Sequence, residues 1–321
     1  MPGDPCANLT ADRLNSRPPP RGQGMLEHCE LCPRRCGANR LQGALGYCRA
    51  GSQTQVYRWG PHHGEEPPVS GTRGSGTVFF SRCTMRCLYC QNFPWSQEGK
   101  GAVLTVQALA GVFEELRGAG CHNWNLVSPT PWLPLIRAAL SELDTRLPIV
   151  YNTSGFERVE VLDAFADLAD VYLTDLRYAD EQTALAGSGA PGYVEAARNA
   201  LRAMWRRRGP LVLDDEGVAR SGTICRLLVL PGLAGEAVAN LRWIAENLGT
   251  ELAVSVMAQY VPAYRAPEHG GGWERRVTAE EYDAVSRAVE ELGFSNGWVQ
   301  EFDAAIPAEL VGYRMAPGQP A

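Results

Sequence analysis

Downstream of Gly71, short apolar segments alternate with longer amphipathic ones, and few folds accommodate this alternation. The short segments are rich in β-branched and aromatic residues, which predicts buried strands, and the longer ones have helical periodicity. Strands that alternate with helices form a parallel sheet covered on both faces, so the expected fold class is α/β. The expected strands are Thr77–Phe80, Asn123–Ser128, Leu147–Tyr151, Val171–Asp175, Cys225–Leu230 and Leu252–Met257. The expected helices are Thr105–Arg117, Pro134–Leu143, Val159–Ala169, Tyr193–Arg207, Gly235–Leu248 and Thr278–Leu292, with Thr105 as an N-cap and a capping box at Thr278 and Glu281.

Three cysteines, Cys83, Cys87 and Cys90, follow the first expected strand. The strand delivers all three thiols into one loop. Cubane iron–sulfur clusters usually take four thiolates, so a local set of three leaves one iron without a protein ligand. An open coordination position is where chemistry can occur. The alternatives are three structural thiols, or three ligands of a four-ligand zinc site.

The run from Cys83 to Cys90 resembles the signature of the radical S-adenosylmethionine (SAM) superfamily. That superfamily spaces its cysteines C-x3-C-x2-C with an aromatic residue before the third, and Tyr89 occupies that place. The resemblance implies a 4Fe–4S cluster whose open iron binds SAM, reductive cleavage of SAM, and hydrogen abstraction from a substrate by the 5′-deoxyadenosyl radical. It also implies a partial (β/α)6 TIM-like barrel with the active site at the C-terminal ends of its strands.

Polar residues follow the next three expected strands. Ser128 and Thr130 follow the second, Asn152 the third, and Asp175 and Arg177 the fourth. The segments at Asn152–Gly155 and Asp175–Arg177 resemble the Thr-x-Gly and Asp-x-Lys patterns with which pyruvate formate-lyase activating enzymes contact SAM. The third residue of the second pattern is arginine here and not lysine. After the second strand the chain departs from the Gly-Gly-Glu segment that the superfamily often has, but the hydroxyls of Ser128 and Thr130 could make the same hydrogen bonds. The expected SAM contacts are Tyr89, Ser128, Thr130, Asn152, Asp175 and Arg177, because a parallel barrel gathers these loops on one face. Local alternatives are a Pro-rich turn after the second strand, a helix cap at Asp175 and a surface charge at Arg177.

A second cysteine cluster lies nearer the N-terminus, with the spacing C-x2-C-x3-C-x11-C at Cys29, Cys32, Cys36 and Cys48. Four soft thiolates suit either zinc or an iron–sulfur cluster, and fourfold ligation favours a structural or electron-relay role. With this cluster, residues 26–265 resemble a subgroup of activating-enzyme-like radical SAM proteins whose substrate is not established. Members tend to have Arg-His in the fifth strand, where this chain has Leu227. Cys121 and Cys225 are expected to be buried hydrophobes.

Composition limits the remaining possibilities. The net charge of −6 suggests no general attraction to nucleic acid or to acidic membranes, and no apolar stretch is long enough to span a membrane. The start lacks the features of a secretory signal, so we expect a reducing cytoplasm, where the cluster could survive. The expected organisation is a disordered lead over 1–25 that includes Cys6, a cysteine-rich metal-binding segment over 26–70, the barrel over 71–300 and a tail over 301–321.

These patterns predict a radical SAM enzyme of oxidoreductase type, related to glycyl-radical-activating enzymes, that abstracts hydrogen from a protein glycine or from another substrate. The expected partners are SAM and an electron donor such as flavodoxin or ferredoxin, and a protein substrate is one option. The alternative in a different class is a non-catalytic iron–sulfur or zinc protein that binds or transfers electrons. Only the enzyme would make 5′-deoxyadenosine.

Overall fold

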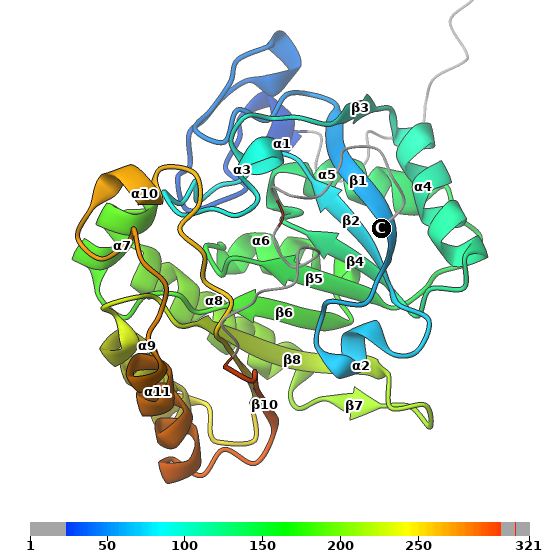
Figure 1. Ribbon diagram of the computed structural model, residues 1–321. Helices are drawn as coiled ribbons and strands as arrows, with labels where there is room; N and C mark the ends of the chain where they lie inside the picture. The colour runs from blue at the N-terminus through cyan, green and yellow to red at the C-terminus, as the bar shows by residue number, and fades with distance from the viewer. Residues whose placement is uncertain (1–23, 303–311, 313–321) are drawn as a thin grey trace, which may run out of the picture.

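The computed structural model describes residues 24–302 and residue 312. Its centre is a ten-stranded sheet in the order β10-β9-β8-β6-β5-β4-β2-β1-β3, with β7 paired to β8 at the side (Figure 1). The strands on this path from β10 to β2 pair in parallel, whereas β1, β3 and β7 pair antiparallel. The strands are β1 (Thr54–His62), β2 (Ser75–Phe80), β3 (Ala102–Leu104), β4 (Trp124–Val127), β5 (Ile149–Thr153), β6 (Val171–Asp175), β7 (Val212–Leu213), β8 (Ala219–Leu228), β9 (Ala253–Met257) and β10 (Gly297–Val299).

The six expected strands correspond to β2, β4, β5, β6, β8 and β9, so the mixed α/β class is confirmed. The largest difference is in the fifth, which begins at Ala219 rather than Cys225. Its first residues are polar and include Gly222, so they do not form an apolar run. Gly222 has a φ of 134°, and a side chain there would meet the backbone of Leu211. The first residues of β8 are therefore held as a strand by close contact with the backbone near Leu211. A pattern of apolar residues in the sequence cannot indicate such a contact.

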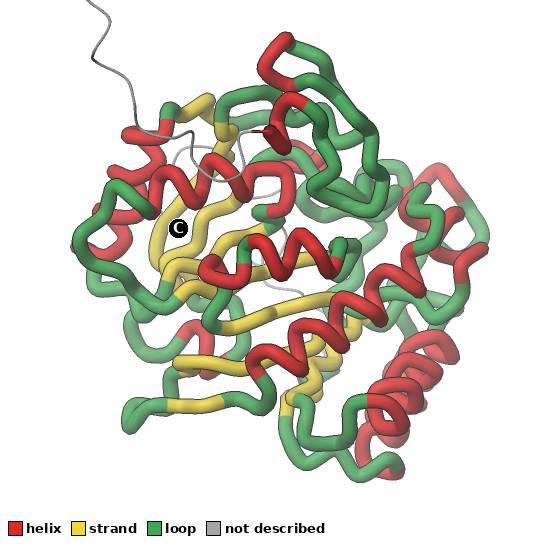
Figure 2. Tube along the Cα trace, turned by 180° about the vertical axis from the view of Figure 1, so that it is seen from behind, coloured by secondary structure: helices red, strands yellow, loops and turns green. Residues whose placement is uncertain are grey.

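Helices cover one face of the sheet, as Figure 2 shows from behind. The long ones follow the expected pattern: α4 (Val106–Gly118), α5 (Leu133–Leu140), α6 (Val159–Ala164), α8 (Tyr193–Arg208), α9 (Ala234–Asn247) and α11 (Ala279–Glu291). The N-cap at Thr105 and the capping box at Thr278 are both confirmed. The expected helix over Val159–Ala169 instead stops at Ala164 and continues as a 3-10 turn, η3 (Ala166–Leu168). Within the described residues, none of the helices has the length and apolarity needed to cross a membrane.

Shorter helices occur in the connections and near the N-terminus. They are α1 (Gly24–Glu27), η1 (Arg40–Gln42), α2 (Pro67–Ser70), α3 (Phe93–Ser96), η2 (Thr130–Trp132), α7 (Glu181–Ser188) and α10 (Ala266–His269). Alone among these, α7 reaches two turns, and the sequence pattern did not predict it. The C-terminal ends of the parallel strands, the connections α3 and α7, and the N-terminal segment lie at the same side of the sheet (Figure 1).

The N-terminal segment is part of the same body as the sheet. Strand β1 lies within the range 26–70 of the expected cysteine-rich segment, and it pairs with β2 along most of its length. Arg40 is almost fully buried, and its guanidinium donates to the carbonyl oxygens of Gly51 and Pro131 at 2.8 and 2.6 Å. Gly60 and Pro61 within β1 interrupt the strand pattern in the sequence. For this reason β1 was not predicted, and the expected sheet began only at Thr77.

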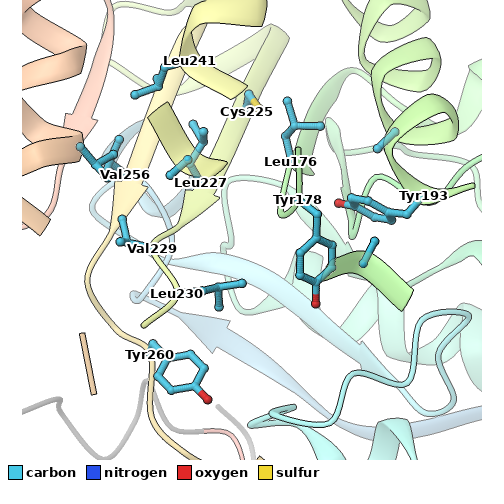
Figure 3. Close-up of a cluster of buried hydrophobic side chains, with 14 of the residues drawn as sticks. Leu176, Tyr178, Tyr193, Cys225, Leu227, Val229, Leu230, Leu241, Val256 and Tyr260 are labelled. Atoms are coloured by element: carbon cyan, nitrogen blue, oxygen red, sulfur yellow. The ribbon is translucent and has the colours of Figure 1, made fainter. Parts of the chain in front are cut away.

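Strand β8 shows how the two faces of the sheet differ. Cys225 and Leu227 belong to a buried cluster on the helix side, together with Leu241 of α9 and Val256 of β9 (Figure 3). Arg226 alternates with them and lines a cavity on the opposite side. The expectation that Cys225 is a buried hydrophobe is confirmed, as it is for Cys121. Leu227 packs in this cluster and is not part of the cavity lining.

Candidate functional site

One cavity collects residues from the C-terminal ends of six strands. The C-terminal ends of these parallel strands therefore meet at one site. Apolar side chains supply much of the wall, and polar groups converge between them. The parallel-strand residues that line it are Phe79 of β2, Val127 of β4, Asn152 and Thr153 of β5, Asp175 of β6, Arg226 and Leu228 of β8, and Met257 of β9; His62 of the antiparallel β1 also lines it.

Cys83, Cys87 and Cys90 all line this cavity, so the structure brings together the three thiols that the sequence singled out. They lie in the loop between β2 and α3. Arg82 and Arg86 precede two of them and have φ values of 75° and 59°. This left-handed backbone is uncommon for arginine, and such conformations concentrate at functional loops.

Each sulfur has a hydrogen-bond partner, although between Ser96 and Cys90 either atom could donate. Arg177 Nη1 and Ser188 Oγ both lie 3.0 Å from Cys87 Sγ. Ser96 Oγ lies 3.2 Å from Cys90 Sγ, and the Met85 backbone N–H donates to Cys83 Sγ at 3.4 Å. Donors aimed at sulfur stabilise thiolates and tune iron–sulfur clusters. The chemistry of this donor set therefore fits a cluster bound through three thiolates.

Burial raises the pKa of Cys83, and it raises the pKa of Cys90 to about 12, with neighbouring thiolate charges adding to the effect. Three negative sulfurs would repel one another in this buried setting, and a cationic centre between them would relieve the repulsion. Within residues 24–302, no three or more His, Cys, Asp or Glu side chains could hold one metal ion. Thiolates of a cubane bind different iron atoms and need not meet at a point.

Asp175 and Arg177 form an ion pair at the end of β6, and both line the cavity. Arg177 Nε donates to Asp175 Oδ2 at 2.9 Å while Nη1 reaches Cys87. Burial alone would lower the pKa of Arg177, but the charges of Asp175 and Cys87 outweigh it and raise the pKa above its usual range. Gly155 has a φ of 79°, and a side chain there would meet the Asp175 backbone oxygen, so the ends of β5 and β6 approach closely. Arg177 is thus half-buried in the site, where it is paired with Asp175, and is not a free surface charge.

The remaining predicted contacts divide into two groups. Tyr89, Ser128 and Asn152 line the cavity. Thr130 is not in the lining, and its hydroxyl donates to the buried carboxylate of Glu157; its expected contact with SAM stays a prediction. Ser128 has a left-handed φ of 59°, so the chain turns at this residue. Ser128 therefore lines the cavity, whereas the Thr130 hydroxyl lies against Glu157.

Tyr89 connects the cavity to a chain of hydroxyl groups. Its oxygen lies 2.7 Å from that of Tyr178, which lies 2.7 Å from Ser188 Oγ, the group that donates to Cys87. The Tyr89 ring stacks on Trp273 at 5.2 Å between centroids. Burial raises the pKa of Tyr89 and of Tyr178 well above the usual range, so both remain neutral and can donate. The chain orients Tyr89 and holds the Cys87 thiol in place.

The sequence reasoning missed a buried charge cluster at the cavity. Arg226 donates through Nε to Glu66 at 2.7 Å and through Nη2 to both Glu65 and Glu66. Glu65 also accepts from Asn125 at 2.8 Å. Burial opposes ionisation of Glu66, but Arg226 outweighs it and lowers the pKa of that carboxyl. One signal was available: Arg226 interrupts an apolar strand, where a charge needs a partner.

Glu157 is a second buried carboxyl that the sequence did not indicate. Thr130 and Thr153 donate to the same oxygen, Oε1. Burial raises the pKa of Glu157 from 4.5 to about 7 despite these hydrogen bonds. The charge of Glu157 in turn contributes to the raised pKa of Cys32. Glu157 therefore lies between the strand ends and the N-terminal cysteines.

The four N-terminal cysteines lie in one region of the structure. Cys29 and Cys32 are buried, Cys48 is half-buried and Cys36 is exposed. Burial raises the pKa of Cys32 to about 12, and the charges of Cys48 and Cys29 contribute. Burial also raises the pKa of Cys48, with contributions from Cys29 and Cys36. The thiols are near enough to affect one another, but the metal that they were expected to bind stays a prediction. Cys6 lies outside the described residues.

Arg34 joins the two cysteine regions. It lies between Cys32 and Cys36 in the sequence, and its Nε donates to the carbonyl oxygen of Thr84 in the other cysteine loop at 2.6 Å. Its Nη2 donates to Gly189, at the end of α7, at 2.9 Å. The guanidinium carbon lies 3.4 Å from the centroid of the Tyr47 ring. One side chain thereby fixes the N-terminal segment against the loop that carries Cys83, Cys87 and Cys90.

Known proteins resemble this chain in sequence and in structure, although no family model matches it. It is 28% identical over 277 residues to the uncharacterized protein MJ0674 of Methanocaldococcus jannaschii, a match that covers 84% of this chain and 75% of that protein. Among solved structures, it is similar to hexahistidine-tagged anSMEcpe with bound AdoMet at a TM-score of 0.43 and 10% identity, over 70% of this chain and 56% of that one. Native anSMEcpe with bound AdoMet gives 0.41 and 9%, over 70% and 58%. These structural matches span little more than half of the solved chains, and likeness at this TM-score carries no functional argument.

Proposed function

We propose that this chain is a radical SAM enzyme that binds a 4Fe–4S cluster through Cys83, Cys87 and Cys90. The observation that carries the proposal is their geometry: three thiols with the spacing C-x3-C-x2-C line one cavity at the C-terminal ends of parallel strands. The sheet is then the partial (β/α)6 barrel of that superfamily. When bound, the cluster supplies the electron for reductive cleavage of SAM.

The protein's own part is to bind, orient and exclude water. Arg177 and Ser188 stabilise the Cys87 thiolate, and Asp175 holds Arg177 in position. Hydroxyl, amide and carboxylate groups of Ser128, Asn152 and Asp175 bind the polar parts of SAM. Side chains of Phe79, Val127, Leu228 and Met257 surround the reacting region and keep water from it.

The spacing of Cys29, Cys32, Cys36 and Cys48 supports a second metal centre, zinc or iron–sulfur, with a structural or electron-relay role, although among the described residues no three His, Cys, Asp or Glu side chains are placed to hold one metal ion. Arg34 couples that segment to the thiol loop, which supports a common function for the two regions. The substrate enters the cavity at the C-terminal ends of the strands. The specific reaction that we propose is glycyl-radical activation, in which a glycine of a substrate protein donates the hydrogen atom. A cytoplasmic location suits an oxygen-sensitive cluster.

The test is anaerobic reconstitution of the full chain with iron and sulfide, followed by incubation with SAM and dithionite. We expect 5′-deoxyadenosine and methionine in equal amounts. A triple alanine variant at Cys83, Cys87 and Cys90 provides the control and should release neither. A reconstituted cluster that binds SAM but yields no 5′-deoxyadenosine would instead favour the electron-transfer protein.

A further inference from the structure

A second crevice lies on the other side of the thiol loop. It is lined by the N-terminal segment, the thiol loop, the end of α7 and the start of α10. In Figure 1, α7 and α10 lie together beside α3. None of the three thiols lines it, so it is separate from the cavity in which SAM is proposed to bind. The residues used below define this basic crevice: Tyr47, Arg86, Leu185, Ser188, Arg265 and His269.

The charge of the crevice is opposite to that of the whole chain. Its lining includes Arg86, Arg265 and His269 and no carboxylate, whereas the chain has a net charge of −6. Among the described residues, neither arginine has an Asp or Glu oxygen within 4.0 Å. Two arginines thus line the crevice without a carboxylate partner, which favours an acidic partner.

The crevice also has exposed apolar groups. Leu185 is 48% exposed and Tyr47 is 36% exposed, and both line it. Protein interfaces combine exposed apolar groups with charged ones, and weak redox encounters use the smaller interfaces. The basic crevice therefore has the composition of a transient protein-docking surface.

Only a thin wall separates the crevice from the thiols. Ser188 lines the crevice, and its hydroxyl donates to Cys87 Sγ at 3.0 Å. Gln97 also lines it and donates to the Cys87 backbone oxygen at 2.9 Å. Next to Ser188 is Gly187, where a Cβ would meet Tyr178 Oη at 2.5 Å, so the end of α7 packs directly on the site. A partner bound in the crevice would therefore be separated from Cys87 Sγ only by the side chain of Ser188.

We propose that the basic crevice is the docking site of an acidic, low-potential one-electron carrier protein that reduces the cluster. This rests on the proposed function, because it needs a cluster at Cys87. In the step, the carrier loses one electron and the cluster gains it, and no bond forms or breaks. A substrate protein would need to approach the cavity where the radical forms, whereas this crevice reaches Cys87 from the opposite side. The position therefore suits electron delivery.

The probe is a reduced acidic flavodoxin, and the readout is the rate of cluster reduction, followed by absorbance in stopped flow without SAM. Arg265→Glu should slow reduction about tenfold at low ionic strength, and the difference should shrink at high salt. Arg265→Lys, which keeps the charge, should match the wild type. Arg287→Glu on α11 provides an equal change of net charge outside the crevice and should also leave the rate unchanged.

Equal rates for Arg265→Glu and Arg287→Glu would overturn the proposal. If Arg265→Glu does not assemble a cluster, Arg86→Glu in the crevice gives the same change of charge and the same comparison with Arg287→Glu. Dithionite should reduce the cluster to the same extent in every variant. Failure of the proposed function is seen separately. If flavodoxin and dithionite both reduce the cluster but SAM yields no 5′-deoxyadenosine, the proposed function fails. The comparison of reduction rates between the variants is still valid in that case. A wild-type protein that assembles no cluster overturns both.

Discussion

Arg177 donates a hydrogen bond from Nη1 to Cys87 Sγ at 3.0 Å. The same guanidinium is held by Asp175 through two other nitrogens. A carboxylate at a strand end thereby fixes the donor that faces a proposed cluster ligand. Hydrogen bonds to cluster sulfurs and nearby positive charge make reduction easier, because both stabilise the more negative state.

Removal of this donor should lower the reduction potential of the cluster. Arg177→Met keeps much of the side-chain volume but loses the charge and the hydrogen bond to Cys87. We expect a decrease of tens of millivolts, where about 60 mV is a tenfold change in the equilibrium for one electron. Potentiometric titration followed by electron paramagnetic resonance measures it. Arg137→Met, on the helix side, is the control, and equal potentials in both variants would contradict the role given to Arg177.

Loss of one thiol should eliminate the cluster. Cys87→Ala removes the sulfur that accepts from both Arg177 and Ser188, and we expect loss of the cluster absorbance and of SAM cleavage. Cys225→Ala is the matched control, because Cys225 is buried on the helix side in contact with apolar residues. That variant should keep both properties. SAM cleavage by Cys87→Ala would refute the ligand assignment.

Asp175 should contribute to the affinity for SAM. In Asp175→Asn the charge that positions Arg177 is lost, together with one charge-assisted acceptor at the cavity. Such an interaction contributes roughly 1.5–3 kcal/mol, so the dissociation constant should rise about ten- to a hundredfold. Calorimetry on the reconstituted protein tests this, with the exposed Asp167→Asn as control. Unchanged affinity with an intact cluster would mean that Asp175 only orients Arg177.

The stability of the metal-free protein should depend on pH through Glu157. Its pKa is raised from 4.5 to about 7, chiefly by burial, so between these values the folded state holds a proton that the unfolded chain releases. Stability therefore falls as the pH rises through this window, by on the order of 3 kcal/mol. Glu157→Gln cannot ionise and should lack this component. Urea unfolding at about pH 5 and about pH 8 compares the two proteins, and parallel pH dependences would be the contrary result.

The N-terminal cysteines should bind metal independently of the thiol loop. A triple alanine variant at Cys83, Cys87 and Cys90 removes the proposed cluster ligands but leaves the other four cysteines in place. Elemental analysis of that variant should still find zinc or iron. A further change, Cys29→Ala together with Cys32→Ala, should remove it. Absence of metal from the triple variant, purified without chelators, would argue against the second site.

Much of the scaffold was predictable because its signals are local. Strand β6 was expected at Val171–Asp175 and has those bounds, since apolar β-branched residues and helical neighbours indicate a buried parallel strand. The cap at Thr105 and the capping box at Thr278 each depend on residues within one turn. Strand β1 was not predicted, because Gly60 and Pro61 weaken its pattern and its partner lies further along the chain.

By itself, the sequence determined which residues form the central strands and helices, and it determined the spacing of the three thiols. Both follow from periodicity and from short-range contacts along the chain. Only the tertiary structure decided what surrounds those thiols. Ser188 is 101 residues from Cys87, and Arg226 is 160 residues from Glu66, so their pairings depend on strand order. A buried charge requires a partner, but nothing local specifies which residue supplies it.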